Sequence, residues 1–245
     1  MSLEDEPPPA RQRFLNAPAS VLWLIAVFVA VYAVQILSPP AVANRLLQAY
    51  ALDPAVYSMR IVVPTLGTVT PSLADRVVPL FSHIFLSVDL VQLGFTCVWL
   101  LAFGSAVARR FGAAAFLGFF LLCGLGAAAI FIALCWGQNI GMVGASGALS
   151  GLVAAASRFM RIGAAPEDDA PEPPFAPLHS PQVFAFGAVW LVASLTLGDI
   201  GAGLSGASQA FVWQPLVGGY LAGLLLSGPF EHYFGYAARL RRAGA

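Results

Sequence analysis

The chain has 245 residues, of which 59% are hydrophobic and 10% are charged, and its formal net charge is zero. A soluble domain carries about 25% charged residues, so these charges are too few to cover a water-soluble fold, and lipid is expected to cover part of the surface. All twelve cationic residues are arginine, and none of them forms a basic patch that would predict nucleic-acid binding. The three cysteines lie in apolar runs, which argues against a disulfide framework or a metal site, and no cofactor is expected.

Apolar runs predict six transmembrane helices when the chain is examined in windows of about 20 residues. They cover residues 20–37, 89–107, 113–136, 145–160, 183–198 and 208–227. The fourth and fifth are short for a helix exposed to lipid, so the fourth is expected inside the bundle. The predicted fold class is therefore an all-α membrane protein with a six-transmembrane-helix bundle over residues 20–230.

The segments between and around these spans have their own character. Residues 1–19 are polar and proline-rich, and predict a disordered lead-in before a retained first span. A long loop, 38–86, follows on the outer side and contains an amphipathic stretch at 42–52. Residues 162–182 are rich in proline and acidic residues and predict a flexible linker. Residues 231–245 combine aromatic and arginine residues, as expected of an amphipathic tail at the inner interface.

The distribution of arginine predicts the orientation. With a cytoplasmic N-terminus, nine arginines fall on the cytoplasmic side and three on the other, which is a positive-inside pattern. The nine are Arg11, Arg13, Arg109, Arg110, Arg158, Arg161, Arg239, Arg241 and Arg242, and the three are Arg45, Arg60 and Arg76. Both termini are thus predicted to be cytoplasmic (N-in/C-in). The all-arginine, alanine-rich composition suggests a bacterial source and hence the inner (plasma) membrane.

The fourth predicted span begins at a Gly-Ala-Ser-Gly turn, residues 144–147. One interpretation is helix packing, because Gly147 and Gly151 form a small-xxx-small ridge that lets another helix approach closely. The sixth span offers a matching ridge at Gly219 and Gly223. The other interpretation is a nucleophilic serine, and the four residues alone do not decide between them.

The wider pattern resembles the rhomboid family of intramembrane serine proteases. The segments that carry the resemblance are 85–104, 108–112, 116–126, 144–151 and 218–223, within about residues 78–228. The resemblance implies a six-helix bundle and a serine endopeptidase that cleaves transmembrane substrates near the outer face. In the family a serine at the start of the fourth helix and a histidine on the sixth form the catalytic dyad.

The family's site residues transfer only in part. Ser146 matches the nucleophile, following Gly144, but Leu216 occupies the position of the histidine. On the second helix, where the family usually has His, His and Asn, this chain has Ser87, Gln92 and Thr96. The latter two positions help to hold the oxyanion in the family.

The loss of the histidine predicts a large loss of proteolysis. A serine hydroxyl needs a base to become a good nucleophile, and in a soluble serine protease removal of the histidine costs on the order of a million-fold in turnover. Among the three histidines, topology lets only His83 reach Ser146, so His83 is either an alternative base or a loop-packing residue.

The polar residues of the second helix also allow two interpretations. Gln92 and Thr96 retain donors that could polarise a carbonyl beside the Ser146 N–H. Alternatively, they and Ser150 bond one another within the bundle.

Two functions therefore stand. The first is a rhomboid-type intramembrane serine protease with impaired or lost proteolysis. The alternative is a rhomboid pseudoprotease that binds transmembrane segments of client membrane proteins within the lipid bilayer. A transporter is disfavoured, since no span carries the charged residues of an ion path.

Overall fold

A computed structural model gives the structure of the chain. It describes residues 17–58, 61–63, 67–69, 71–160, 175–205 and 213–235. The predicted disordered lead-in lies almost entirely outside these residues, as do most of the predicted linker and most of the tail.

Three long apolar segments confirm that this is a helical protein suited to a membrane. The first is α1 (Ala19–Leu37), with a mean hydropathy of 2.4. The second joins α4 (Leu90–Trp99), a π-helical turn η3 (Leu100–Gly104) and α5 (Ser105–Phe111) into a 22-residue run. The third is α6 (Ala113–Leu134), also 22 residues long. At 1.5 Å per residue, 20 residues span about 30 Å, the thickness of a bilayer's hydrocarbon core.

Two shorter apolar helices differ in their surroundings. In α7 (Ser146–Ser157) every residue after the first is buried, so protein rather than lipid encloses this helix. The helix α8 (Pro181–Ser205) has 25 residues, so the predicted limits of 183–198 were too short. Its first part, Pro181–Thr196, is apolar. It begins inside the predicted flexible linker.

The last helix, α9 (Gln214–Phe230), begins later than the predicted sixth span, whose residues 208–212 lie outside the described part. A π-helical turn, η4 (Glu231–Gly235), continues it into the predicted tail.

The long loop between α1 and α4 is structured rather than extended. It contains α2 (Pro40–Tyr50), η1 (Pro54–Tyr57), β1 (Ile61–Val63), β2 (Gly67–Val69), α3 (Leu73–Ser82) and η2 (His83–Phe85). The two strands form a small antiparallel hairpin, a minor exception to the all-α prediction. Helix α3 was not predicted, although Ser72 and Asp75 form a capping box at its start.

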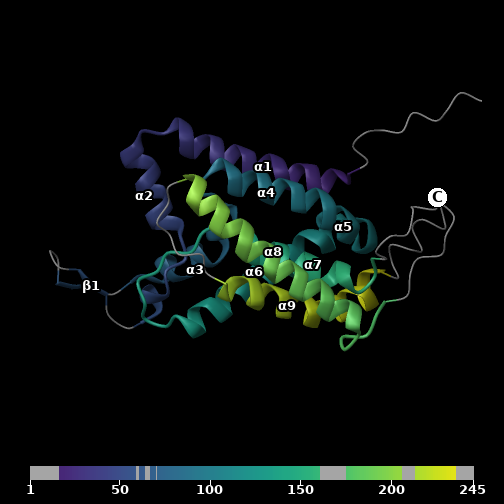
Figure 1. Cartoon of the computed structure of the whole chain (residues 1–245). Helices are drawn as coiled ribbons and strands as arrows, with labels where there is room; N and C mark the ends of the chain where they lie inside the picture. Colours follow the sequence, from purple (N-terminus) through teal and green to yellow (C-terminus); the bar gives the residue numbers. More distant parts are fainter. Residues whose placement is uncertain are drawn as a thin grey trace, which may run out of the picture.

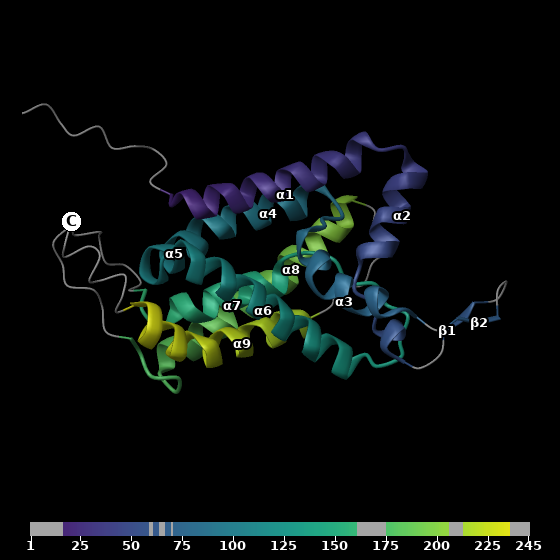
Figure 2. The ribbon, with the colours of Figure 1, turned by 180° about the vertical axis from the view of Figure 1, so that it is seen from behind.

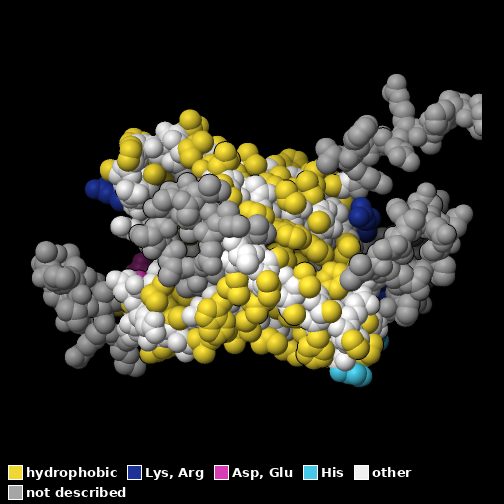
Figure 3. All heavy atoms as spheres, viewed as in Figure 1, with side chains coloured by type: hydrophobic (Ala, Val, Ile, Leu, Met, Phe, Trp, Pro, Cys, Tyr) yellow, Lys and Arg dark blue, Asp and Glu magenta, His cyan; other side chains and the backbone are white. Residues whose placement is uncertain are grey.

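The helices run between two ends of the molecule (Figures 1 and 2). The loop elements α2 and α3 and the hairpin lie at one end, together with the start of α7. The start of α1, helix α5 and the end of α9 lie at the other. We call these the Ser146 end and the Arg158 end. On the face shown in Figure 3, hydrophobic side chains cover most of the described surface between them.

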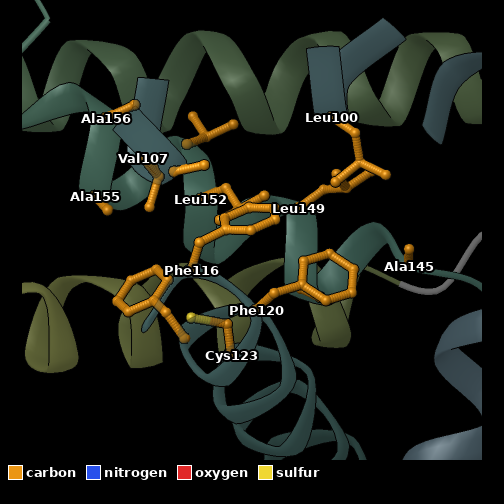
Figure 4. Packing of buried hydrophobic residues seen from close by; sticks show 14 of the residues in the cluster. Leu100, Val107, Phe116, Phe120, Cys123, Ala145, Leu149, Leu152, Ala155 and Ala156 are labelled. Carbon is orange, nitrogen blue, oxygen red and sulfur yellow. The ribbon is translucent and has the colours of Figure 1, made fainter. Parts of the chain in front are cut away.

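Close contact among α6, α7 and α9 forms the centre of the bundle. A Cβ added to Gly219 would overlap the carbonyl of Gly147, and one added to Gly223 would overlap the carbonyl of Gly151. These two helices therefore touch backbone to backbone. Large side chains of α6, such as Phe116, fill the space beneath α7 (Figure 4).

Candidate functional site

The turn that leads into α7 depends on a glycine. Gly144 has a φ of +114°, a region that favours glycine. Its N–H donates to the carbonyl of His83 over 2.8 Å. A Cβ at Gly144 would lie 2.5 Å from Nε2 of Gln92, so that side chain packs directly on the turn. Helix α7 then begins at Ser146 without a side-chain cap, which leaves its first N–H groups available.

Ser146 is half-buried at the first position of α7. Its carbonyl accepts a hydrogen bond of 2.8 Å from the hydroxyl of Ser150. That hydroxyl in turn accepts one of 2.8 Å from Nε1 of Trp190 on α8. Ser150 therefore serves an interhelical contact between α7 and α8.

Leu216 lies in the first turn of α9 and is 1% exposed. It belongs to the same apolar cluster as Ala145 and Leu149, which flank Ser146. The neighbouring Pro215 carbonyl would lie 3.1 Å from a Cβ on Gly147, so the first turns of α7 and α9 are adjacent. An apolar side chain thus occupies the part of α9 beside the start of α7.

Gln92 and Thr96 are engaged within the bundle. The Gln92 side chain accepts from the N–H of Val88 over 2.7 Å and donates to the carbonyl of Val143 over 3.4 Å. Asp89 caps α4 by accepting from the Gln92 N–H over 2.7 Å. The hydroxyl of Thr96, which is 3% exposed, donates to the Gln92 carbonyl over 3.0 Å. Gln92 thus joins the start of α4 to the residue before Gly144.

Ser87, at the first of the family's three second-helix positions, is also buried. Its backbone rather than its hydroxyl makes the contact with α1: the Ser87 carbonyl accepts from Nε2 of Gln35 over 3.3 Å.

His83 is almost fully buried at the junction of α3 and η2. Its ring Nδ1 lies 2.7 Å from the carbonyl of Pro79. Burial lowers the pKa of His83 to about 4, because an apolar environment disfavours the charged ring. At neutral pH the ring is therefore uncharged, and Nδ1–H donates to Pro79.

The Arg158 end holds a cluster that the sequence analysis missed. Nε and Nη2 of Arg110 donate to the two carboxylate oxygens of Glu231 over 2.7 and 2.9 Å. Its guanidinium also lies over the rings of Phe159 and Phe175. These residues come from distant parts of the chain, so no local pattern reveals their contact.

Arg158 completes this cluster as the C-cap of α7. Its guanidinium donates to the Ser227 hydroxyl over 2.9 Å and to the Ala176 carbonyl over 2.9 Å, and stacks on Phe175 at 4.0 Å. The Ala176 N–H returns a bond to the Arg158 carbonyl over 2.6 Å. The described end of the predicted linker is therefore fixed to α7 and α9.

Within the described ranges, no group of three or more His, Cys, Asp or Glu residues is placed to hold a metal ion. Around the Ser146 turn the side chains offer hydroxyl and amide groups, the neutral ring of His83 and the carboxylate of Asp89, which caps α4.

Comparison with known proteins identifies one family. A family model described as Rhomboid domain matches residues 74–230, which is well over half of the chain. A search of curated proteins finds no match. The matched range includes the Gly144 turn, both glycine ridges and, apart from Glu231, the cluster at the Arg158 end.

Proposed function

This chain belongs to the rhomboid family of integral membrane proteins, and from that premise we propose that it has lost efficient proteolysis and binds transmembrane segments of client membrane proteins. One observation carries the proposal: Leu216, buried and apolar, lies on α9 beside the start of α7. A serine hydroxyl without a base is a poor nucleophile, so Ser146 is expected to stay unreactive.

The polar groups around the turn support the same proposal. The side chains of Gln92 and Thr96 form hydrogen bonds with neighbouring backbone groups. As oxyanion donors they would first have to leave these partners, although the second amide hydrogen of Gln92 and the first N–H groups of α7 remain. Such donors suit the polar backbone of a bound segment better than they suit catalysis.

The proposal includes six membrane helices with both termini on the cytoplasmic side of a bacterial inner membrane. The uneven distribution of arginine supports this orientation. The start of α1 and the end of α9 also lie at the same end of the bundle (Figures 1 and 2). A chain that crosses the membrane an even number of times has its two termini on the same side.

Reactivity of the serine tests the loss of proteolysis. Purified protein in detergent is treated with a fluorophosphonate, beside a Ser146→Ala control, and we expect no labelling of the parent chain. Leu216→His, alone or with Gln92→His and Thr96→Asn, should gain labelling. Leu216→Asn is the matched control, because it adds polarity without a base. Labelling of the parent that disappears in Ser146→Ala would overturn the proposal.

Client binding needs a separate measurement. A benzoylphenylalanine at Val91, on α4 next to Gln92, should crosslink single-span membrane peptides in liposomes. The same probe at Leu225 on α9, which is 69% exposed, serves as the control for lipid-mediated proximity. Equal crosslinking at both positions would argue against a binding role for this region.

A second candidate function is proteolysis with His83 as the base. It is favoured by one contact, the hydrogen bond from Gly144 to the His83 carbonyl, which brings this residue to the turn. Two observations oppose it: the ring is bonded to Pro79, and a pKa of about 4 makes it a weak base at neutral pH. Labelling of the parent chain that His83→Asn abolishes would favour it, because asparagine is not a base.

A further inference from the structure

Several hydrogen bonds meet at His83, and the Leu80 carbonyl also lies within reach of its ring. Its backbone N–H and its ring Nδ1–H both donate to the carbonyl of Pro79, the ring over 2.7 Å. Its own carbonyl accepts the N–H of Gly144 over 2.8 Å. The residue therefore joins the end of α3 to the turn before α7, although 61 positions separate it from Gly144 in the chain.

The ring contributes a second donor to the junction. Pro79 lies inside α3, and its carbonyl comes at the point where the helix ends. This carbonyl already accepts the His83 backbone N–H, and its second lone pair can accept from another donor. The neutral ring supplies a second donor from Nδ1, which fixes the tautomer and holds the His83 backbone against α3.

Neighbouring contacts convert this local bond into a constraint on the turn. The side chain of Ile84, the next residue, fills the space beside Gly124 on α6, where a Cβ would overlap it. The junction is thus held against α6 on one side. Gly144 lies between the His83 carbonyl and the Gln92 side amide, and the turn has little freedom to move.

We propose that His83 is a positioning residue: its Nδ1–H bond to Pro79 orients its carbonyl, which holds the Gly144 N–H and thereby sets the direction in which α7 and Ser146 begin. The inference goes beyond the proposed function, because it holds whether or not Ser146 reacts. It predicts that the donor at the position of Nδ1, rather than a titrating ring, is the essential group.

Two isosteric substitutions separate these roles. In His83→Asn the side-chain amide nitrogen takes a position close to Nδ1, and it retains a donor for Pro79. In His83→Gln the amide lies closer to Nε2, and it loses that donor while keeping polarity. His83→Ala removes both. Ser82→Ala is the matched control, because it deletes a hydrogen bond of 2.9 Å to the Tyr50 carbonyl in the same junction without touching Gly144.

Hydrogen exchange at the Gly144 amide of the full chain in detergent measures the effect. We expect exchange at least about fivefold faster in His83→Gln and His83→Ala, as loss of one hydrogen bond of ordinary strength implies. His83→Asn and Ser82→Ala should stay close to the parent rate. The Met142 amide, which donates to the Leu52 carbonyl over 2.8 Å, is the internal reference and should not change.

The same measurement can overturn the proposal. Exchange in His83→Asn as fast as in His83→Ala would show that the Nδ1 donor is not the essential group. Unchanged exchange in His83→Ala would remove the role of the ring. Acceleration at Met142 equal to that at Gly144 would make His83 a general packing residue instead of a positioning one.

Discussion

The two ends of the bundle are stabilised by different means. At the Ser146 end the polar groups around the turn are neutral, and they bond to one another: His83 to Pro79 and Gly144, and Gln92 to Val88 and Val143. At the Arg158 end, buried guanidinium groups meet a carboxylate and aromatic rings. Among the described contacts of α7 and α9, the charged side chains thus lie at the C-terminal ends of the two helices.

Helix polarity explains part of this difference. Both α7 and α9 begin at the Ser146 end and finish at the Arg158 end. The partial negative charge at a helix C-terminus favours a cation, and Arg158 lies at the C-terminus of α7 and donates to groups near the end of α9. The N-termini could assist an anion, but Leu216 adds no group that would generate one. The comparison therefore agrees with the proposed loss of efficient proteolysis at the Ser146 end.

Removal of one charge at the Arg158 end should produce the largest loss of stability. Arg110→Met leaves the Glu231 carboxylate, whose side chain is only 13% exposed, without its bidentate partner. Loss of one member of a buried pair typically costs about 3 kcal/mol or more. The free energy of unfolding, measured by denaturant titration in mixed micelles, should fall by about that amount.

A double variant sharpens this test. Arg110→Met with Glu231→Leu removes both charges and should recover a substantial part of the loss, because replacement of both partners by apolar groups is often nearly neutral. Equal losses in the single and double variants would mean that the pair is not what makes the Arg158 end stable.

The glycine contacts between the two ends should respond less strongly. Gly219→Ala places a methyl group against the backbone of Gly147, and the helices must separate. Overpacking of this kind costs about 1–3 kcal/mol. Gly118→Ala on α6 is the matched control, since nothing lies within 4 Å of its added Cβ, and it should change the free energy of unfolding by less than about 0.5 kcal/mol. A control as damaging as Gly219→Ala would point to helix propensity instead of contact.

The sequence predicts the fold where apolar length is decisive. Hydropathy places α1, α6 and the α4–α5 run within a few residues of their limits, because lipid-facing helices must be apolar along their length. It is less accurate for α8, which begins two residues before and ends seven residues after its predicted limits. Hydropathy also misses α3. A capping box and contacts within the loop stabilise this helix, and it has no long apolar run.

The site follows from the sequence only as far as the order of residues along the chain. That order gives the resemblance, and with it Ser146 and the missing histidine at Leu216. The hydrogen bonds of Gln92 could not be predicted, because its acceptor Val143 lies 51 residues away. The contact of Arg110 with Glu231 spans 121 residues, so only the folded chain brings this pair together.

The smallest expected effect is the pH dependence of stability, which arises from His83 at the Ser146 end. Burial lowers the pKa of His83 to about 4 in the folded chain, below its ordinary value of 6.5. Protons therefore bind the unfolded state first, so the stability that the neutral ring provides is complete above pH 6.5 and is lost as the pH falls toward 4. Between pH 7 and pH 5.5 this amounts to on the order of 1 kcal/mol. His83→Asn has no titrating ring, so over the same range the free energy of unfolding of the parent should fall by that amount relative to this variant. The pair Arg110 and Glu231 is present in both proteins and cancels in the comparison. A difference that stays constant from pH 7 to pH 5.5 would mean that the ring is accessible to water, and that the Ser146 end is less closed than its neutral hydrogen bonds imply.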